Sequence, residues 1–265
     1  MNLHIDLDYY KKTYPDLKVI CKSDRDYITH WNKYGKIEKR KICKKNFIKT
    51  KIVGGLGNQL FIIFNVLSLS KKFNMIPIFS YDKNYKKNYK KEHNILRKNV
   101  DEYNLFNKLN FDEEIEFYNS SKSSKPFNDY SEKEYKFNEI KLNNNNYTIK
   151  GYFQSYKYFL NEVDFIKENL NLDYNLINKI KTIYKSTNKK ILSIHMRIGD
   201  YEILQDFHPM LPKEYYKKAL SYFDLNEYQI ILFSDSILKA KKKLEDLNVN
   251  FHLADDYFKN DEEQF

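Results

Sequence analysis

The pattern of hydrophobic and polar positions changes its period several times along the chain, and each change predicts an element. Apolar runs at residues 47–53 (FIKTKIV) and 75–80 (MIPIFS) have the length of buried strands. Between them, residues 58–73 carry apolar side chains at helical spacing. A strand, a helix and a strand in this order predict a βαβ unit with parallel strands.

The C-terminal part of the chain shows the same alternation. Strands are expected at residues 190–197, 229–235 and 250–254, with helices at 212–223 and 236–247 between them. Pro212 stands where the first of these helices begins, which is a favoured position for proline. This order predicts a second parallel α/β domain, connected to the first by a helix over residues 175–185.

The remaining segments are less regular. Residues 3–43 predict a small helical module with aromatic side chains at helical spacing and a helix end at Gly35, and the basic residues 36–45 predict a linker. Residues 81–150 are polar and rich in Ser and Asn, which indicates surface insertions with a few short elements. Asn119 and Asn146 begin strings that match glycosylation acceptors. We therefore place a helical module at 1–45, a first domain at 46–185 and a second at 186–265, which we expect to be incomplete at its C-terminus.

Composition narrows the class of protein. With 265 residues, of which 42% are hydrophobic, the chain can form a substantial core. The net charge of +10 suits an anionic partner, namely nucleic acid, a phosphorylated ligand or a membrane surface, although an AT-rich genome gives a similar composition. Cys21 and Cys43 form no CxxC pair, which argues against a cysteine zinc site and a disulfide scaffold. The sequence shows no signal peptide and no membrane span, so we expect a cytoplasmic protein, soluble or peripheral to a membrane.

Glycine is rare, with six residues in the chain, and three of them lie in Gly54-Gly-Leu-Gly-Asn-Gln59. This string follows a predicted strand and opens a predicted helix, where free backbone N–H groups and the helix dipole favour an anion. It matches neither the GxGxxG fingerprint nor a Walker A loop. Two interpretations are open: a ligand-binding loop, or a tight turn needed for helix–strand packing.

The string His195-Met-Arg-Ile-Gly-Asp-Tyr201 ends another predicted strand. Ligands of open α/β sheets bind at the carboxyl ends of strands, and a guanidinium at Arg197 suits a diphosphate. The alternative is that Arg197 pairs with Asp200 and fixes the loop. Strand alternation places His195 on the same side as Arg197.

Two further groups of polar residues are candidates. Ser234 and Asp235 end the next strand and can contact a base or ribose, or cap the following helix. Asp6-Leu-Asp8 and Asp24-Arg-Asp26 have the form of a metal-binding DxD motif, but helix capping explains them better. No other ligand spacing is present, and we predict no metal.

Together these strings resemble a family. GGLGNQLF and HMRIGDY, with the segments GYFQSYKYF (151–159) and FSD (233–235), look like the α-1,2-fucosyltransferases of glycosyltransferase family 11. The patterns of that family are approximately GGLGNQMFQYA and HxRRGDY. Residues 6–40 resemble a short module found beside bacterial and viral glycosyltransferases, of the form DYY…YPDL…HW…YG.IE.R.

The resemblance implies a GT-B-like fold, in which two Rossmann-like domains face a cleft. It implies transfer of fucose from GDP-fucose to a glycan acceptor with inversion, without a metal or other cofactor. Arg197 would contact the diphosphate and stabilise the charge that develops on it. The implied donor-binding residues are Gly55, Gly57, Asn58, His195, Arg197, Ser234 and Asp235. Gln154 and Ser155 would lie on the acceptor side, and Asp200 is the candidate general base.

Two departures from the family keep alternatives open. Ile198 stands where the family has a second arginine, which is compatible with a different nucleotide-sugar donor. A downstream motif with Ser and Trp is missing, which is compatible with an inactive nucleotide- or glycan-binding fragment. Nucleic-acid binding is not expected, because the basic residues are scattered along the chain rather than grouped in a motif.

Overall fold

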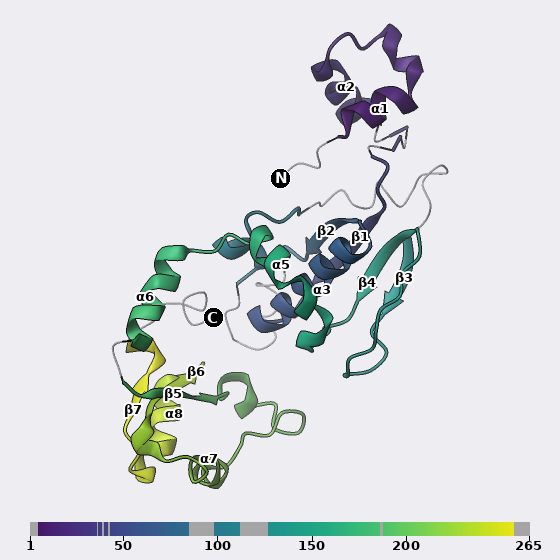
Figure 1. Ribbon diagram of the computed structural model, residues 1–265. Helices are drawn as coiled ribbons and strands as arrows, with labels where there is room; N and C mark the ends of the chain where they lie inside the picture. Colours follow the sequence, from purple (N-terminus) through teal and green to yellow (C-terminus); the bar gives the residue numbers. More distant parts are fainter. Residues whose placement is uncertain are drawn as a thin grey trace. The chain divides into compact units, whose positions relative to one another are not determined.

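The computed structural model describes residues 5–35, 37–38, 40–41, 43–84, 98–111, 127–185 and 188–256. These residues form two compact units that meet in the sequence between Leu172 and Asp173. Both units contain parallel sheets with helices, which confirms the α/β class (Figure 1). None of the helices in the described ranges is long and apolar enough to cross a membrane.

The first unit is built on a four-stranded parallel sheet with the order β2-β1-β4-β3. Its strands are β1 (Phe47–Ile52), β2 (Ile76–Tyr81), β3 (Phe127–Ser131) and β4 (Asn146–Lys150). Helix α3 (Leu56–Lys72) packs on β1 and β2, and α5 (Val163–Asn169) packs on α3 (Figure 1). The predicted βαβ unit is therefore confirmed, with the helix beginning two residues earlier than expected.

Strand β1 is an interior strand of this sheet, and its side chains alternate between buried and more exposed. Ile48, Thr50 and Ile52 are buried on one face, and the Thr50 hydroxyl donates a hydrogen bond to the Ile149 carbonyl over 2.9 Å. The hydroxyl therefore satisfies its own burial by bonding to the neighbouring strand.

Residues 81–150 contain short elements, as expected, but two of them, β3 and β4, are strands of the sheet and not parts of a surface insertion. Strand β4 is an interior strand of the sheet, and Asn146 at its start is buried, with its side chain accepting a hydrogen bond from the Phe47 N–H over 2.9 Å. The glycosylation-like string at Asn146 is thus part of the sheet. The string at Asn119 lies outside the described residues.

The N-terminal module consists of short helices, as predicted. They are α1 (Leu7–Thr13), a 3₁₀ turn (Pro15–Val19), α2 (Asp24–His30) and a π-helical turn (Trp31–Gly35). Asp6 caps α1 through the Tyr9 N–H, and Ser23 and Asp26 form a capping box on α2. The two DxD strings therefore contain helix caps, in agreement with the sequence interpretation.

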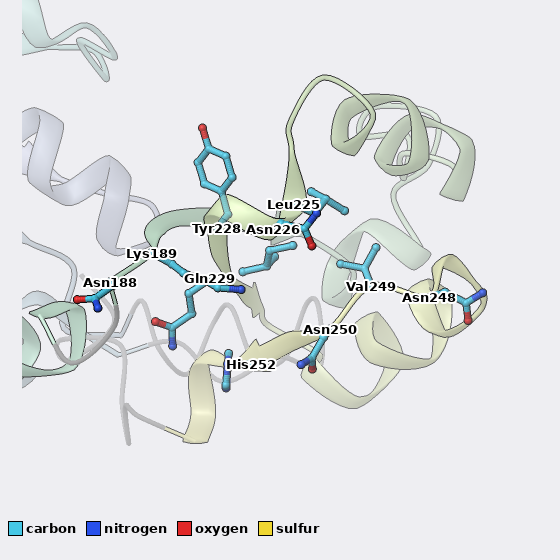
Figure 2. A pocket seen from close by; sticks show the side chains of 11 residues that line it. Asn188, Lys189, Leu225, Asn226, Tyr228, Gln229, Asn248, Val249, Asn250 and His252 are labelled. Atoms are coloured by element: carbon cyan, nitrogen blue, oxygen red, sulfur yellow. The ribbon is translucent and has the colours of Figure 1, made fainter.

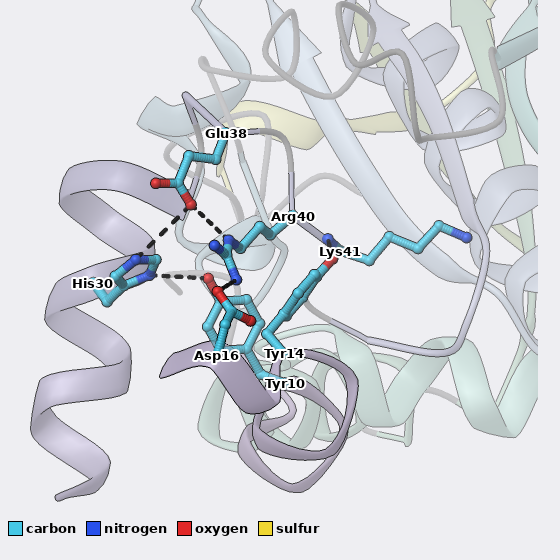
Figure 3. Close-up of polar contacts among 7 residues, drawn as sticks. All are labelled: Tyr10, Tyr14, Asp16, His30, Glu38, Arg40 and Lys41. Atoms are coloured by element: carbon cyan, nitrogen blue, oxygen red, sulfur yellow. Dashed lines mark hydrogen bonds and ion pairs between the residues drawn. The ribbon is translucent and has the colours of Figure 1, made fainter. Parts of the chain in front are cut away.

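Residues after Gly35 do more than link the module to the sheet. Arg40 forms ion pairs with Asp16 (2.8 Å) and Glu38 (2.5 Å), and its guanidinium lies 4.8 Å from the centre of the Tyr14 ring (Figure 3). Cys43 is buried in the core of the module. The prediction of a simple basic linker over residues 36–45 is therefore wrong, because the described part of this segment closes the module.

The packing of aromatic side chains in the module also explains why a glycine stands at position 35. Tyr10 is fully buried and hydrogen-bonds through its hydroxyl with His30 Nδ1 over 3.2 Å (Figure 3). A Cβ atom at Gly35 would lie 2.5 Å from the Tyr10 hydroxyl oxygen and 2.7 Å from the Trp31 ring. Glycine is required there because the backbone approaches two aromatic side chains.

The second unit is built on a three-stranded parallel sheet with the order β5-β6-β7. Its strands are β5 (Lys190–Met196), β6 (Tyr228–Ser234) and β7 (Phe251–Leu253), and its helices are α6 (Tyr174–Lys185), α7 (Lys213–Leu220) and α8 (Ile237–Leu244). Side chains of α7 and α8 share one core with the three strands. The predicted alternation is confirmed, although α6 groups with this unit and the sequence placed the domain boundary after residue 185.

Short 3₁₀ turns complete both units. In the first they span Val100–Glu102, Asn104–Phe106, Tyr156–Tyr158 and Leu160–Glu162. In the second they span Gly199–Glu202, Leu225–Glu227, Glu245–Leu247 and Ala254–Asp256. The turn at Gly199 directly follows β5 and shapes the candidate site.

Candidate functional site

The carboxyl ends of β5 and β6 bring one arginine and two carboxylates together. Arg197 follows β5, and its Nε and Nη2 atoms lie 2.9 and 2.7 Å from Asp200 Oδ1. Its Nη1 atom lies 2.9 Å from Asp235 Oδ2, at the end of β6. Three of the five guanidinium N–H donors are therefore used, and one remains on each terminal nitrogen.

Asp235 also holds the loop that carries Arg197. Its Oδ1 atom accepts a hydrogen bond from the Ile198 N–H over 2.9 Å. A Cβ atom at Gly199 would lie only 2.3 Å from Asp235 Oδ2, so a larger residue cannot occupy this position without a shift. The rare glycine of this string is thus explained by the close approach of a carboxylate.

The side chain of Asp200 is almost completely buried, with 6% of its surface exposed, whereas that of Arg197 is 31% exposed. Asp200 and Asp235 contact different edges of the guanidinium, so the two carboxylates together hold its position. The ion pair between Arg197 and Asp200, which the sequence analysis gave as an alternative, is therefore present. Part of the Arg197 side chain nevertheless remains exposed.

The neighbouring candidates are arranged differently. Ile198 is 3% exposed and packs in the core of the second unit, so this position is used for packing here. His195 is exposed near the end of β5. The Ser234 hydroxyl accepts a hydrogen bond from the Ser236 N–H over 3.0 Å, at the residue that precedes α8.

Aromatic side chains border the arginine. The Arg197 guanidinium lies 5.7 Å from the centre of the Tyr201 ring, and this ring stacks on His208 with a centroid distance of 4.8 Å and an interplanar angle of 10°. Tyr201 belongs to the sequence string, but nothing in the pattern of the chain pointed to His208.

The glycine string of the first unit forms the turn between β1 and α3. Gly54 has a φ of +85°, a conformation that favours glycine, and Gly55 is the N-cap residue of α3 without a side-chain cap. Gly57 faces open space, with no atom within 4 Å of a Cβ atom placed there. The tight turn accounts for Gly54, whereas local packing does not account for Gly57.

The segment after β4 reaches back to this helix. Gln154 donates a hydrogen bond from Nε2 to Asn58 Oδ1 over 2.6 Å. Ser155 caps the following 3₁₀ turn through the Lys157 N–H. The structure therefore brings two of the sequence strings together at the carboxyl ends of β1 and β4.

Glu132 holds the backbone that presents Gln154, and the sequence gave no signal for it. Its Oε2 atom accepts hydrogen bonds from the N–H groups of Tyr152 (2.8 Å) and Phe153 (3.0 Å). Phe153 is fully buried at a φ of +52°, which is unfavourable for a residue with a side chain. The carboxylate thus stabilises a strained turn immediately before Gln154.

Side chains that could bind a metal are not clustered in the described parts of the chain. Within these ranges no group of three or more His, Cys, Asp or Glu residues is placed to hold a metal ion. The polar groups at the two sheet ends are one arginine with its carboxylates in the second unit, and amides, a hydroxyl and a helix N-terminus in the first.

The chain is similar in sequence to a curated glycosyltransferase. No family model matches the chain. The chain is similar to the O-antigen biosynthesis glycosyltransferase WbnK of Escherichia coli, with 28% identity over 195 residues. The match covers 69% of this chain and 57% of the relative, so the chain spans a little over half of that protein's length.

Among solved structures, the chain is similar to NodZ fucosyltransferases. The α-1,6-fucosyltransferase NodZ co-crystallized with GDP is 12% identical, with a TM-score of 0.43 over 80% of this chain and 79% of that chain. NodZ from Bradyrhizobium gives 12% identity and a TM-score of 0.45 over the same shares.

Proposed function

We propose that the chain acts as a glycosyltransferase that moves fucose from GDP-fucose to a hydroxyl of a galactoside or related glycan, with inversion and without a metal. The observation that carries this proposal is Arg197, fixed at the carboxyl end of a parallel strand by Asp200 and Asp235. The similarity to an O-antigen glycosyltransferase and the sequence strings shared with α-1,2-fucosyltransferases support it.

In this reaction the acceptor oxygen forms a bond to the anomeric carbon while the bond from that carbon to the β-phosphate oxygen breaks. The electron pair of the broken bond goes to the phosphate, and the hydroxyl proton goes to a base. The two remaining N–H donors of Arg197 suit the phosphate oxygens on which the charge develops. Because its side chain is 6% exposed and bonded to Arg197, Asp200 is better suited to orienting the guanidinium than to taking the proton.

In the first unit, the candidate contacts are backbone groups and amides. Gly55 and Gly57 leave the N-terminus of α3 uncovered, and a helix N-terminus favours an anionic or polar ligand atom. Asn58 and Gln154 present further donors and acceptors at the same place. We propose donor contacts for the glycine string and acceptor contacts for Gln154 and Ser155.

A transferase for another nucleotide sugar is the second candidate. It is favoured by Ile198, which is buried in the core where the family pattern has a second arginine. With one arginine instead of two, the phosphate contacts differ from those of the family, and the preferred donor can differ with them.

Calorimetric titration of the chain with GDP tests the proposal. We expect binding that falls roughly ten- to hundredfold in Arg197→Ala, because charge-assisted hydrogen bonds are lost. Arg25→Ala, an exposed arginine of the N-terminal module, is the matched control and should bind GDP like the parent chain. Equal binding by Arg197→Ala would refute the phosphate role.

Activity then separates the two donors. The chain is incubated with GDP-fucose and with uridine sugars in the presence of lactose, and the products are analysed by mass spectrometry. Fucosylated lactose supports the first candidate, and transfer from a uridine sugar supports the second. GDP binding without any product would leave a nucleotide-binding protein and contradict both transferase proposals.

A further inference from the structure

A large cavity lies at the amino-terminal edge of the second sheet, away from the arginine site. It has a volume of about 800 Å³, within the usual range for small-molecule sites. Its walls include Lys189 before β5, Tyr228 at the start of β6 and Asn250 before β7 (Figure 2). Arg197 and Asp235 follow the opposite ends of β5 and β6, so the cavity is a separate place in the same unit.

The chemistry of the walls is dominated by primary amides. Five of the eleven lining residues carry one: Asn188, Asn226, Gln229, Asn248 and Asn250. Each amide offers two N–H donors and an acceptor oxygen, which is the combination that pairs of sugar hydroxyls can satisfy. Such a wall favours a ligand that has many hydroxyl groups.

Charge argues against ionic ligands. None of the eleven lining residues that the structure describes is an Asp or Glu, which disfavours a cation. Lys189 is the one lysine or arginine among them, whereas diphosphate and carboxylate sites usually converge several donors of positive charge. A neutral polar ligand is the class that remains.

The walls also provide apolar surface. Leu225 and Val249 line the cavity together with the amides (Figure 2), whereas the Tyr228 ring packs against Phe223 with the ring centroids 5.5 Å apart. A sugar ring has both hydroxyl edges and C–H faces, and aromatic and aliphatic side chains cover the latter. The mixture of amides and apolar groups therefore matches a saccharide better than a purely polar or purely apolar molecule.

Several of these amides are available to a ligand. The side chains of Asn188, Asn248 and Asn250 are exposed and make no hydrogen bond with the rest of the described chain. They come from three segments that are distant in sequence: the approach to β5, the end of the 3₁₀ turn after α8, and the approach to β7. The sheet register alone brings these segments together.

We propose that this cavity binds a neutral saccharide, at a site separate from the arginine site. The inference stands on the cavity itself and does not require the transfer reaction. If the transferase proposal holds as well, the second unit carries one site for the nucleotide sugar and another for a glycan.

The test follows side-chain amide signals of the labelled full chain by NMR during titration with lactose. We expect signals of Asn188, Asn226, Asn248 and Asn250 to shift together, and the double variant Asn188→Ala/Asn250→Ala to weaken this binding roughly tenfold, because two hydrogen bonds are lost. Asn32→Ala, an exposed asparagine of the N-terminal module, is the matched control. Should the double variant fail to fold, Asn250→Asp gives the same readout with nearly unchanged shape.

Competition and a second variant locate the saccharide. Excess inorganic sulfate should leave the shifts unchanged, and displacement by sulfate would make the cavity an anion site and overturn the proposal. Lactose shifts that disappear in Gln154→Ala but persist in the double variant would place the sugar in the first unit and also overturn it. Transfer of fucose to lactose without lactose-induced shifts of these amide signals would refute this inference alone and leave the proposed function standing.

Discussion

Gln154 donates a hydrogen bond to Asn58 over 2.6 Å, although the two residues are 96 positions apart in the chain. The contact joins the turn after β1 to the segment after β4, which Glu132 holds in place. Both amides are side chains that the sequence suggested for ligand binding, and neither is buried. The hydrogen bond between Gln154 and Asn58 therefore joins two separate sequence strings into one polar surface.

Replacing Gln154 tests whether this surface binds the acceptor. In Gln154→Ala we expect the free energy of unfolding to fall by no more than about 1 kcal/mol, because the lost hydrogen bond is exposed. The KM for the glycan acceptor should rise while the Kd for GDP stays unchanged. Lys157→Ala, exposed on the following turn, is the control for both measurements. An altered GDP affinity would instead assign Gln154 to the donor.

Asp235 provides a test of how the arginine is held. In Asp235→Asn the ion pair to Arg197 is lost, and we expect weaker binding of GDP and of inorganic pyrophosphate by a similar factor. A residue that contacts the nucleoside would affect GDP alone, so the ratio of the two affinities separates the roles. Asp206→Asn, an exposed carboxylate in the same unit, controls for the change of net charge.

Replacing glycine by alanine should have opposite effects on stability at Gly199 and at Gly57. Gly199→Ala places a Cβ atom against Asp235 and should lower both the melting temperature and GDP affinity. Gly57→Ala adds a methyl group in open space in the first turn of α3. Its free energy of unfolding should rise by up to about 1 kcal/mol, because alanine favours the helix.

The ligand result for Gly57→Ala is the informative one. If GDP approaches the N-terminus of α3, the added methyl group lowers affinity in a protein that is at least as stable as the parent. Unchanged GDP binding would show that the donor does not contact this turn. Thermal unfolding and calorimetry on both alanine variants provide the comparison.

Replacing Asn65, in the middle of α3, by an apolar residue should stabilise the protein. Asn65 is completely buried, and neither atom of its amide has a hydrogen-bond partner in the described structure. Because buried unpaired polar groups are unfavourable, Asn65→Leu should raise the free energy of unfolding by about 1–2 kcal/mol in denaturant titration. Destabilisation instead would mean that the amide makes a bond to buried water in solution.

The N-terminal module should lose stability in alkali. Burial raises the pKa of Tyr10 well above its ordinary value, and nearby Arg40 opposes this only in part. The unfolded chain releases the tyrosine proton near pH 10. The folded module retains it, so the stabilisation is complete below that pH and is lost as the pH rises above it. Trp31 lies beside Tyr10, and its fluorescence reports the transition.

Trp31 is the single tryptophan of the chain, so the signal belongs to this module. Tyr10→Phe removes the ionisable group and should flatten the loss of stability above pH 10, while it costs about 1 kcal/mol at neutral pH through the lost bond to His30. An equally steep alkaline transition in Tyr10→Phe would assign the effect to other groups.

The sequence predicted the elements that have a clear period. Strands β5 (KILSIHM) and β6 (YQIILFS) are rich in apolar residues, and the helix after the glycine string has a long apolar face, so both regions were predicted within two residues. Strands β3 (FNDYS) and β4 (NYTIK) are short and polar, and β4 begins in a run of asparagines. The pairing of β4 with β1 and of β3 with β4 depends on tertiary contacts that no local pattern contains.

The residues of the candidate site could likewise be predicted only in part. Arg197 and Asp235 were both singled out because they end predicted strands, but their ion pair requires neighbouring strands to be in register. Glu132 was missed because it lies among polar residues and acts only through the backbone of a distant turn. Arg40 was assigned to a linker because it lies in a stretch rich in basic residues. The sequence alone does not show that it forms an ion pair with Asp16 of the module.

The position of β4 has a consequence for the synthesis of the chain. Thr50 on β1 bonds to Ile149 on β4, 99 residues later, and β4 covers the edge of β1 that β2 does not. While the ribosome synthesises the residues between β2 and β4, the elements β1, α3 and β2 are already present. The edge of β1 that later pairs with β4 is unpaired during this time. Unpaired edges favour association between nascent chains, and closure over such a long loop is slow. The interval before β4 emerges is therefore the time at which the first unit is most exposed to association with other chains.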